Sequence, residues 1–194
     1  MILETSRLII RPFIRDDLLV IHRILSQALG DASMAEYLPE SALEERRSWL
    51  EWHVLSQEWF VKLRQPPYGD RAITLKTSSQ VIGSIGYVPC LNPFEQIPEL
   101  ATTPYPTRHY TTELGLFWVI DPKHQRQGYA SEAAQAMIEY AFKQLRLKRI
   151  IATTEHANVA SQGVMRKIGM KLTRNPLHEP RWLQVVGVLD NTSD

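Results

Sequence analysis

The sequence has little of what several classes of protein need. It contains a single cysteine, Cys90, so no disulfide can form within the chain and a reducing compartment is expected. No apolar run reaches the length of a membrane-spanning helix. The N-terminal stretch is broken by Arg7, Arg11 and Arg15, which is unlike a signal peptide. We therefore expect a soluble, cytoplasmic protein that has no membrane partner.

A large charge of one sign is also lacking. The 22 Lys and Arg residues nearly balance 21 Asp and Glu residues, which gives a formal net charge of +1. Such a chain has no general attraction for nucleic acid, and we expect no nucleic-acid partner. The six histidines form no metal-ligand motif, so no metal site is predicted. Any bound anion must therefore be held by a local group of residues.

Patterning predicts one α/β or α+β domain over residues 1–194, because the length suits one core and no repeat or linker divides the chain. Apolar stretches predict strands at 7–14, 71–77, 81–88, 113–120, 149–154 and 182–189. Helices are predicted after Asp16 and Asp17, after a capping box that begins at Ser41, from Ser131 to Arg146, and from Asn158 to a left-handed stop at Gly169. Residues 89–112 hold five of the twelve prolines and are predicted to form a long loop.

The stretch KHQRQGYASEA, residues 123–133, lies between a predicted strand and a predicted helix. The first N–H groups of a helix have no partner within it, and a strand that turns directly into a helix offers them to a phosphate. Gly128 and Ala130 keep bulky side chains away from such an anion, and Arg126 adds positive charge. A plain surface turn is the alternative. The spacing matches neither the GxxxxGK[ST] loop nor the GxGxxG fingerprint.

This turn resembles that of the GCN5-related N-acetyltransferases, the GNAT family. Their signature Q/R-x-x-G-x-G/A, between the fourth strand and the following helix, is matched by Gln125, Gly128 and Ala130. The segments LETSRLIIRPFIRDD, VIGSIGY and NVASQGVMRKIGM are similar, in the same order, to segments of the subgroup that includes the ribosomal-protein N-terminal acetyltransferases. The resemblance implies a mixed, mostly antiparallel central sheet flanked by helices, with splayed fourth and fifth strands.

The resemblance implies that acetyl-CoA is the cosubstrate. Its pyrophosphate would lie on the backbone amides of Gln125, Arg126, Gln127, Gly128, Tyr129, Ala130 and Ser131. The strand before the turn, at Trp118, Val119 and Ile120, would pair with the pantetheine arm as an added strand does. Lys123, His124 or Arg126 would meet the ribose phosphate, and a solvated basic turn is the open alternative.

Three further residues receive roles from the same resemblance. Glu113 is the candidate base that takes a proton from the amine, with an exposed strand-end carboxylate as the alternative. Asn158 would contact the cosubstrate, cap a helix, or do both. Ser161 would donate a hydrogen bond near the sulfur. The sequence departs from many relatives at Met165, where they carry a tyrosine that acts as an acid.

We therefore expect an acyltransferase that moves an acetyl group directly from acetyl-CoA to a primary amine, which is a protein N-terminus or a small molecule. We expect a monomer or a homodimer, with the loop 89–112 shaping the acceptor site. The alternative is an acyl-CoA-binding regulatory module with weak turnover, an interpretation that Met165 supports.

Overall fold

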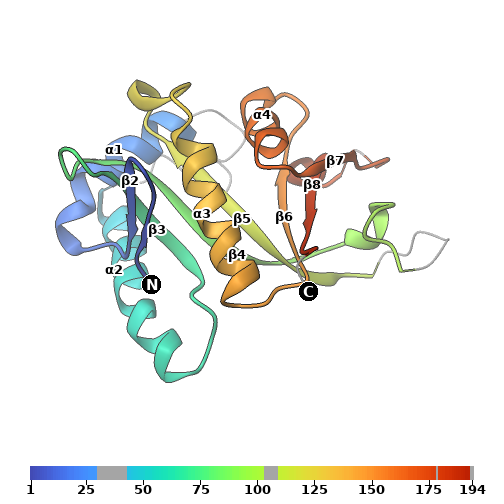
Figure 1. Cartoon of the computed structure of the whole chain (residues 1–194), viewed down its shortest axis with the longest axis horizontal. Helices are drawn as coiled ribbons and strands as arrows, with labels where there is room; N and C mark the ends of the chain where they lie inside the picture. The colour runs from blue at the N-terminus through green and yellow to red at the C-terminus, as the bar shows by residue number, and fades with distance from the viewer. Residues whose placement is uncertain (30–42, 103–108, 178, 193–194) are drawn as a thin grey trace. The chain divides into compact units, whose positions relative to one another are not determined.

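The computed structural model describes residues 1–29, 43–102, 109–177 and 179–192 (Figure 1). Over this part of the chain the strands form one sheet in the order β1-β2-β3-β4-β5-β6-β8-β7. The strands are β1 Leu3–Glu4, β2 Leu8–Arg11, β3 Gly69–Leu75, β4 Val81–Asn92, β5 Thr111–Ile120, β6 Arg149–Thr154, β7 Lys171–Arg174 and β8 Val185–Asp190. The α-helices are α1 Leu18–Leu29, α2 Leu43–Lys62, α3 Tyr129–Lys143 and α4 Val159–Lys167. The predicted fold class, a mostly antiparallel sheet flanked by helices, is confirmed.

The contacts group the chain into two compact units, residues 1–87 with 117–137 and residues 88–116 with 138–194. Strands β4 and β5 and helix α3 contribute residues to both units. The first residues of β5 therefore belong to one unit and its last residues to the other. That residues 1–194 form a single domain stays a prediction.

The first unit is an antiparallel meander of β1, β2, β3 and the first part of β4, with Leu8 opposite Leu75 and Asp70 opposite Gly86. Helices α1 and α2 cover one face of these strands and α3 covers the other (Figure 1). The apolar side chains of α1 and α2 pack on residues from the sheet, and this core comprises Phe13, Leu18, Ile21, Ile24, Leu25, Leu50, Ala72, Val81 and Val119. On the α3 side, the Tyr87 hydroxyl donates a hydrogen bond to the Met137 carbonyl.

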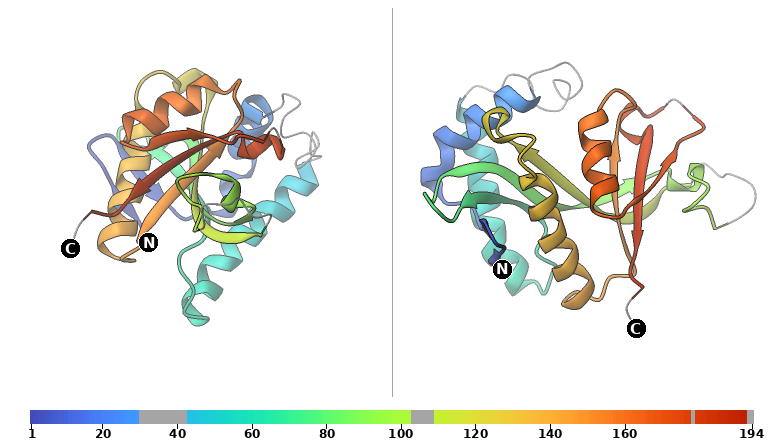
Figure 2. Two further views of the ribbon diagram at one scale, coloured as in Figure 1. Left: turned by 90° about the vertical axis from the view of Figure 1, so that its right-hand side faces the viewer. Right: turned by 45° about the horizontal axis from the view of Figure 1, so that its top comes forward.

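The second unit is built on β6. This strand runs parallel to β5, with Gly115 opposite Ile151, and antiparallel to β8, which also pairs with β7. Helix α4 packs against β6, β7 and β8 (Figure 2). The core comprises Phe94, Ile97, Leu100, Ile151, Leu183, Val186 and Val188, and Cys90 packs against it. Burial raises the pKa of the Cys90 thiol, which fits a packing role better than that of a nucleophile.

Several predicted boundaries were wrong. The predicted loop 89–112 is part strand, because β4 continues through Pro89 to Asn92, and a 3₁₀ turn follows at Phe94–Gln96. Proline is tolerated where a strand does not need its N–H for pairing, and most residues of this part of β4 are exposed or half-buried. The short strands β1 and β7 were not predicted, because segments this short cannot display the alternation of apolar and polar residues that marks a strand. Helix α3 begins at Tyr129 rather than Ser131, and the last strand begins at Val185 rather than Trp182.

The predicted helix caps have mixed outcomes. Asn158 caps α4 as predicted, and Gly169 has a φ of +86°, as expected of a left-handed stop. Asp17 caps the 3₁₀ turn Arg15–Asp17, which leads directly into α1, because its carboxylate accepts a hydrogen bond from the N–H of the N-cap residue Ile14; it also pairs with Arg11. The capping box predicted at Ser41 lies outside the described residues.

Helix α2 buries a histidine in the first unit. The His53 ring lies 4.1 Å from the Trp49 ring, centroid to centroid, and its Nδ1 is 2.9 Å from the Trp49 carbonyl oxygen. Burial lowers the pKa of His53 to about 4. Nearby on β3, burial raises the pKa of Asp70 to about 6, against the effect of a hydrogen bond from Ser84. The two groups therefore change stability with opposite sign as the pH falls.

We predict that His53 makes the protein sensitive to mild acid. The unfolded chain protonates a histidine near pH 6.5, whereas folded His53 protonates near pH 4, so its contribution to stability is lost as the pH falls between these values. Urea unfolding at pH 7, 5.5 and 4 should show wild type losing roughly 2–3 kcal/mol relative to His53→Gln. The opposite effect of Asp70 is present in both proteins and cancels. His156→Gln, at an exposed histidine, is the control and should run parallel to wild type; a parallel His53→Gln curve would contradict the prediction.

Candidate functional site

The candidate site in the first unit begins where β5 ends. Asp121 is fully buried and caps the 3₁₀ turn Pro122–His124 by accepting a hydrogen bond from the Lys123 N–H at 3.0 Å. Its carboxylate also pairs with Arg23 of α1 at 2.8 Å. Burial alone would raise the pKa of Asp121, but the Arg23 guanidinium and the Lys123 N–H outweigh burial and lower it. A charged carboxylate therefore anchors the start of the turn to helix α1.

The side chain of Gln125 closes the other side of this short turn. Its amide Nε2 donates to the Ile120 carbonyl at 3.0 Å, so Gln125 binds the end of the strand that precedes it. The side chain of this signature residue is thus used to shape the loop, and its backbone N–H donates to the Pro122 carbonyl at 3.4 Å.

Two residues of the turn have left-handed backbone conformations. Arg126 has a φ of +59° and Gly128 a φ of +84°. A left-handed residue other than glycine costs on the order of 1 kcal/mol, and such strain gathers at functional sites. Left-handed residues that alternate with ordinary ones turn successive N–H groups towards a common point and form a concave anion site. The backbone at residues 126–128 has this alternation.

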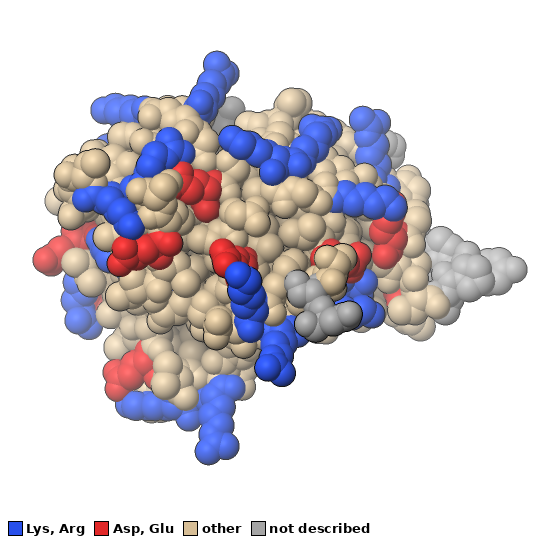
Figure 3. Space-filling model, viewed as in Figure 1, with Lys and Arg blue, Asp and Glu red and all other residues tan. Residues whose placement is uncertain are grey.

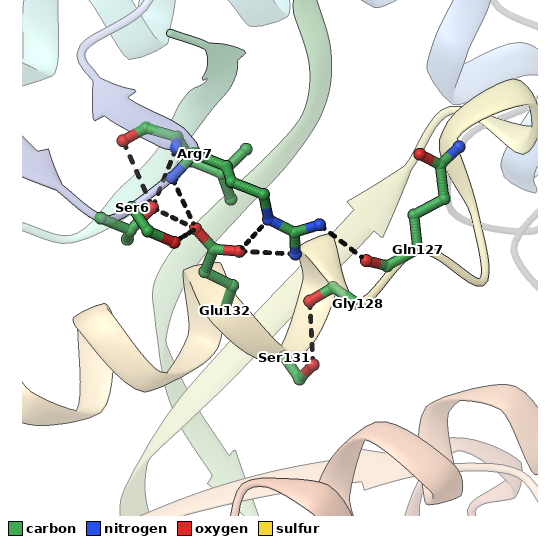
Figure 4. Close-up of polar contacts among 8 residues, drawn as sticks. Ser6, Arg7, Gln127, Gly128, Ser131 and Glu132 are labelled. Atoms are coloured by element: carbon green, nitrogen blue, oxygen red, sulfur yellow. Dashed lines mark hydrogen bonds and ion pairs between the residues drawn. The ribbon is translucent and has the colours of Figure 1, made fainter.

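Helix α3 follows the turn at once and adds its own donors. Its hydrogen bonding begins with the Glu132 N–H donating to the Gly128 carbonyl at 3.0 Å, so the N–H groups of Tyr129, Ala130 and Ser131 lie ahead of the first helical bond. The Ser131 hydroxyl donates to the Gly128 carbonyl at 2.9 Å (Figure 4). Ser131 therefore offers its backbone N–H, and its side chain steadies the turn.

Three of the predicted cosubstrate residues lie on the last part of β5, in the same unit. Val119 and Ile120 are buried, and Trp118 is half-buried. Gly83 of β4 lets the two strands approach closely, because a Cβ at Gly83 would lie 2.3 Å from the Val119 carbonyl oxygen. The structure thus brings residues 118–120 and 125–131 together within the first unit, joined by the Gln125–Ile120 hydrogen bond.

The other predicted residues lie in the second unit. The Asn158 side-chain oxygen accepts a hydrogen bond from the Ser161 N–H at 3.0 Å, so Asn158 is a helix cap, and it is also exposed. Ser161 is half-buried at the first turn of α4. Met165, in the place of the family's tyrosine, is buried to 1 % exposure and packs towards Gly187 of β8. Its side chain belongs to the core of this unit.

Glu113 forms a bidentate ion pair with Arg149, the first residue of β6. Arg149 Nη2 lies 2.6 Å from one carboxylate oxygen, and Nε donates to the other at 2.9 Å. The Glu113 side chain is 9 % exposed, so the alternative of an exposed carboxylate was wrong. The pair ties β5 to β6 near their parallel contact at Gly115. That Glu113 is a base stays a prediction.

On the face seen in Figure 3, the described basic and acidic side chains are interspersed. Within the described residues no group of three or more His, Cys, Asp or Glu could hold a metal ion. None of the helices in that part of the chain is long and apolar enough to cross a membrane.

The residues that hold the turn from a distance were not predicted from the sequence. Arg23 pairs with a residue 98 positions away, and Arg7 and Glu132 are 125 positions apart. No local pattern predicts such pairs. The one available signal was Asp121 before Pro122, a common way to cap a short helical turn.

Comparison with known proteins identifies the family. The family model "Acetyltransferase (GNAT) domain" matches residues 7–171. The chain belongs to the GNAT family. The Bacillus subtilis protein named uncharacterized N-acetyltransferase YnaD is 33% identical over 173 residues, covering 87% of this chain and 82% of the relative. The family carries out acetyl transfer with acetyl-CoA, so acetyl transfer is the general class of chemistry that membership supports for this GNAT chain.

Solved structures share the fold. A GNAT-family acetyltransferase from Bacillus anthracis has a TM-score of 0.68 at 24% identity, with 100% of both chains covered. A structure titled as RimL, the ribosomal L7/L12 α-N-protein acetyltransferase in complex with coenzyme A, has a TM-score of 0.66 at 15% identity, also with 100% of both chains covered. At these identities the likeness concerns the GNAT fold and not the acceptor.

We predict that a side chain at Gly128 blocks the cosubstrate. Gly128→Glu places a strained residue and a negative charge where the diphosphate would bind, and coenzyme A affinity should fall at least about 100-fold by calorimetry. Gly169→Glu is the matched control, because Gly169 has nearly the same φ and its added Cβ would meet nothing closer than 3.8 Å. The control should lose similar stability and keep its affinity. Unchanged affinity in Gly128→Glu would rule out the turn as the anion site.

Proposed function

We propose that the protein is an acetyl-CoA-dependent N-acetyltransferase that transfers the acetyl group directly to a primary amine, either a protein N-terminus or a small molecule. The observation that carries the proposal is the turn between β5 and α3, with left-handed Arg126 and Gly128 ahead of a helix N-terminus. The turn suits a diphosphate, because a diphosphate can be bound by several backbone N–H donors without a metal ion.

The chain's own residues can be given roles in this reaction. The N–H groups of residues 126–131 would hold the diphosphate, and the edge of β5 at 118–120 would accept the amide-rich arm as an added strand. Lys123 and Arg126, both exposed, would attract the remaining phosphate. Asn158 and Ser161 would supply polar contacts from the start of α4.

Acyl transfer also needs proton handling. An amine is protonated near neutral pH and must lose a proton before it attacks the thioester carbonyl, so a base or a water chain has to accept that proton. Glu113 remains our candidate for the base, and its carboxylate forms a bidentate ion pair with Arg149. The same ion pair equally suits a purely structural role that joins β5 to β6. The two roles predict different effects of substitutions on the rate of acetyl transfer.

Paired substitutions at Glu113 and Arg149 separate these roles. If Glu113 is the base, Glu113→Gln should lower the rate of acetyl transfer at least about 100-fold, as loss of a general base does. Arg149→Gln, which breaks the same ion pair but keeps the carboxylate, should then lower the rate far less. If the two variants lose rate and melting temperature equally, Glu113 is a tie and the base lies elsewhere. Coenzyme A affinity serves as the control in both variants.

A second candidate is an acyl-CoA-binding regulatory module. The buried Met165, in the place of the family's tyrosine acid, favours it, because a thioether cannot protonate a leaving thiolate. A thiol-release assay with acetyl-CoA and a panel of amines and N-terminal peptides should show acceptor-dependent release. Binding of acetyl-CoA without release on any acceptor would favour the module instead.

A further inference from the structure

Arg7 and Glu132 form an extensive polar contact at the start of α3. Arg7 Nε and Nη2 lie 2.7 and 2.6 Å from the same carboxylate oxygen of Glu132 (Figure 4). The second oxygen accepts hydrogen bonds from the Thr5 hydroxyl at 2.6 Å, the Ser6 hydroxyl at 3.1 Å and the Arg7 N–H at 2.9 Å. All of these residues belong to the first unit.

The same guanidinium reaches the turn itself. Arg7 Nη1 donates to the Gln127 carbonyl at 3.1 Å, and Arg7 Cζ lies 4.4 Å from the centroid of the Tyr129 ring. Arg7 therefore touches the residue before Gly128 and the residue after it. The Arg7 side chain thus contacts both neighbours of Gly128, although Arg7 is not one of the residues whose N–H groups would bind the anion.

Glu132 also raises an electrostatic question for the site. A carboxylate in the first turn of a helix stabilises that helix but repels an anion bound at the same end. Burial tends to raise the pKa of Glu132, but hydrogen bonds from Thr5, Arg7 and Ser6 outweigh it and hold the pKa below its usual value. The carboxylate is therefore charged, and the Arg7 charge offsets it.

We propose that Arg7 and Glu132 are a positioning pair for the diphosphate turn: Glu132 fixes the guanidinium, and the guanidinium fixes the Gln127 carbonyl and so the N–H groups on either side of Gly128. This inference rests on the proposed function, since it concerns how the same turn holds coenzyme A. Arg7 acts through the turn and is not itself an anion ligand.

Binding of coenzyme A to purified variants tests the pair. Arg7→Gln should raise the dissociation constant about ten-fold, the size expected for loss of charge-assisted hydrogen bonds, and should raise KM for acetyl-CoA with little change in kcat. Glu132→Gln should weaken binding in the same direction. If Arg7 were a direct anion ligand, freeing its charge from Glu132 would strengthen binding, so tighter binding by Glu132→Gln would overturn the proposal.

Stability measured alongside separates positioning from a purely structural role. Arg7→Lys keeps a positive charge beside Glu132 but lacks the planar fork that also reaches Gln127. It should regain most of the melting temperature lost in Arg7→Gln while its coenzyme A affinity stays weak. Affinity that returns together with stability would mean that the pair merely stabilises the fold.

Arg15→Gln supplies the matched control. Arg15 and Glu51 also form an ion pair in this unit, a bidentate one at 2.7 and 3.1 Å that joins the 3₁₀ turn Arg15–Asp17 to α2. Breaking it should leave coenzyme A affinity unchanged. The double variant of Arg7→Gln and Glu132→Gln should bind about as well as either single variant, because each single substitution already breaks the same Arg7–Glu132 pair. Losses of affinity that add up in the double variant would contradict this. Wild type that fails to bind coenzyme A would instead sink the proposed function.

Discussion

The fold has to hold a short stretch of backbone in a conformation that it would not adopt alone. Residues 125–131 carry two left-handed positions and the unpaired donors of a helix start, and one of the left-handed residues is an arginine. A bound anion stabilises such a backbone, but the free protein has to maintain it without one. The strain and the unpaired donors must therefore be balanced by contacts from elsewhere in the first unit.

Those contacts come from parts of the chain that are distant in sequence. Arg23 of α1 holds Asp121 at the start of the turn, Gln125 ties the turn to the end of β5, and Arg7 holds its far side. Each contact is made by a side chain on a regular element or beside one, which is rigid enough to fix a loop. In the proposed site the binding donors are main-chain groups, and the side chains around them act as supports. Such a division would let a chain of nearly zero net charge bind a diphosphate.

The features that could be predicted from the sequence are those that depend on residues close together in the chain. The helix cap at Asn158, the left-handed Gly169 and the buried strand β5 each depend on a few neighbouring residues, and all three were predicted. The Arg7–Glu132 pair depends on β2 and α3 meeting in space, which no local pattern records. The strand at Pro89 was not predicted for a related reason: proline disfavours a strand in general, but it fits where no neighbouring strand needs a backbone N–H at its position.

The role of Glu113 shows how a residue can match a family position and still differ in environment. Its place on β5 suggested a base, but only the fold reveals Arg149 opposite it on the parallel strand. A carboxylate that makes two bonds to one guanidinium is well placed to join strands, and it must give up part of that pairing to take a proton. Met165 also differs in environment, since its buried thioether adds packing to the second unit at the position where, by the resemblance, many relatives carry a tyrosine. The proposed diphosphate site relies on backbone donors of the first unit, whereas proton transfer depends on particular side chains. A change at Glu113, Ser161 or Met165 would therefore alter the acyl-transfer step and leave the turn between β5 and α3 in place.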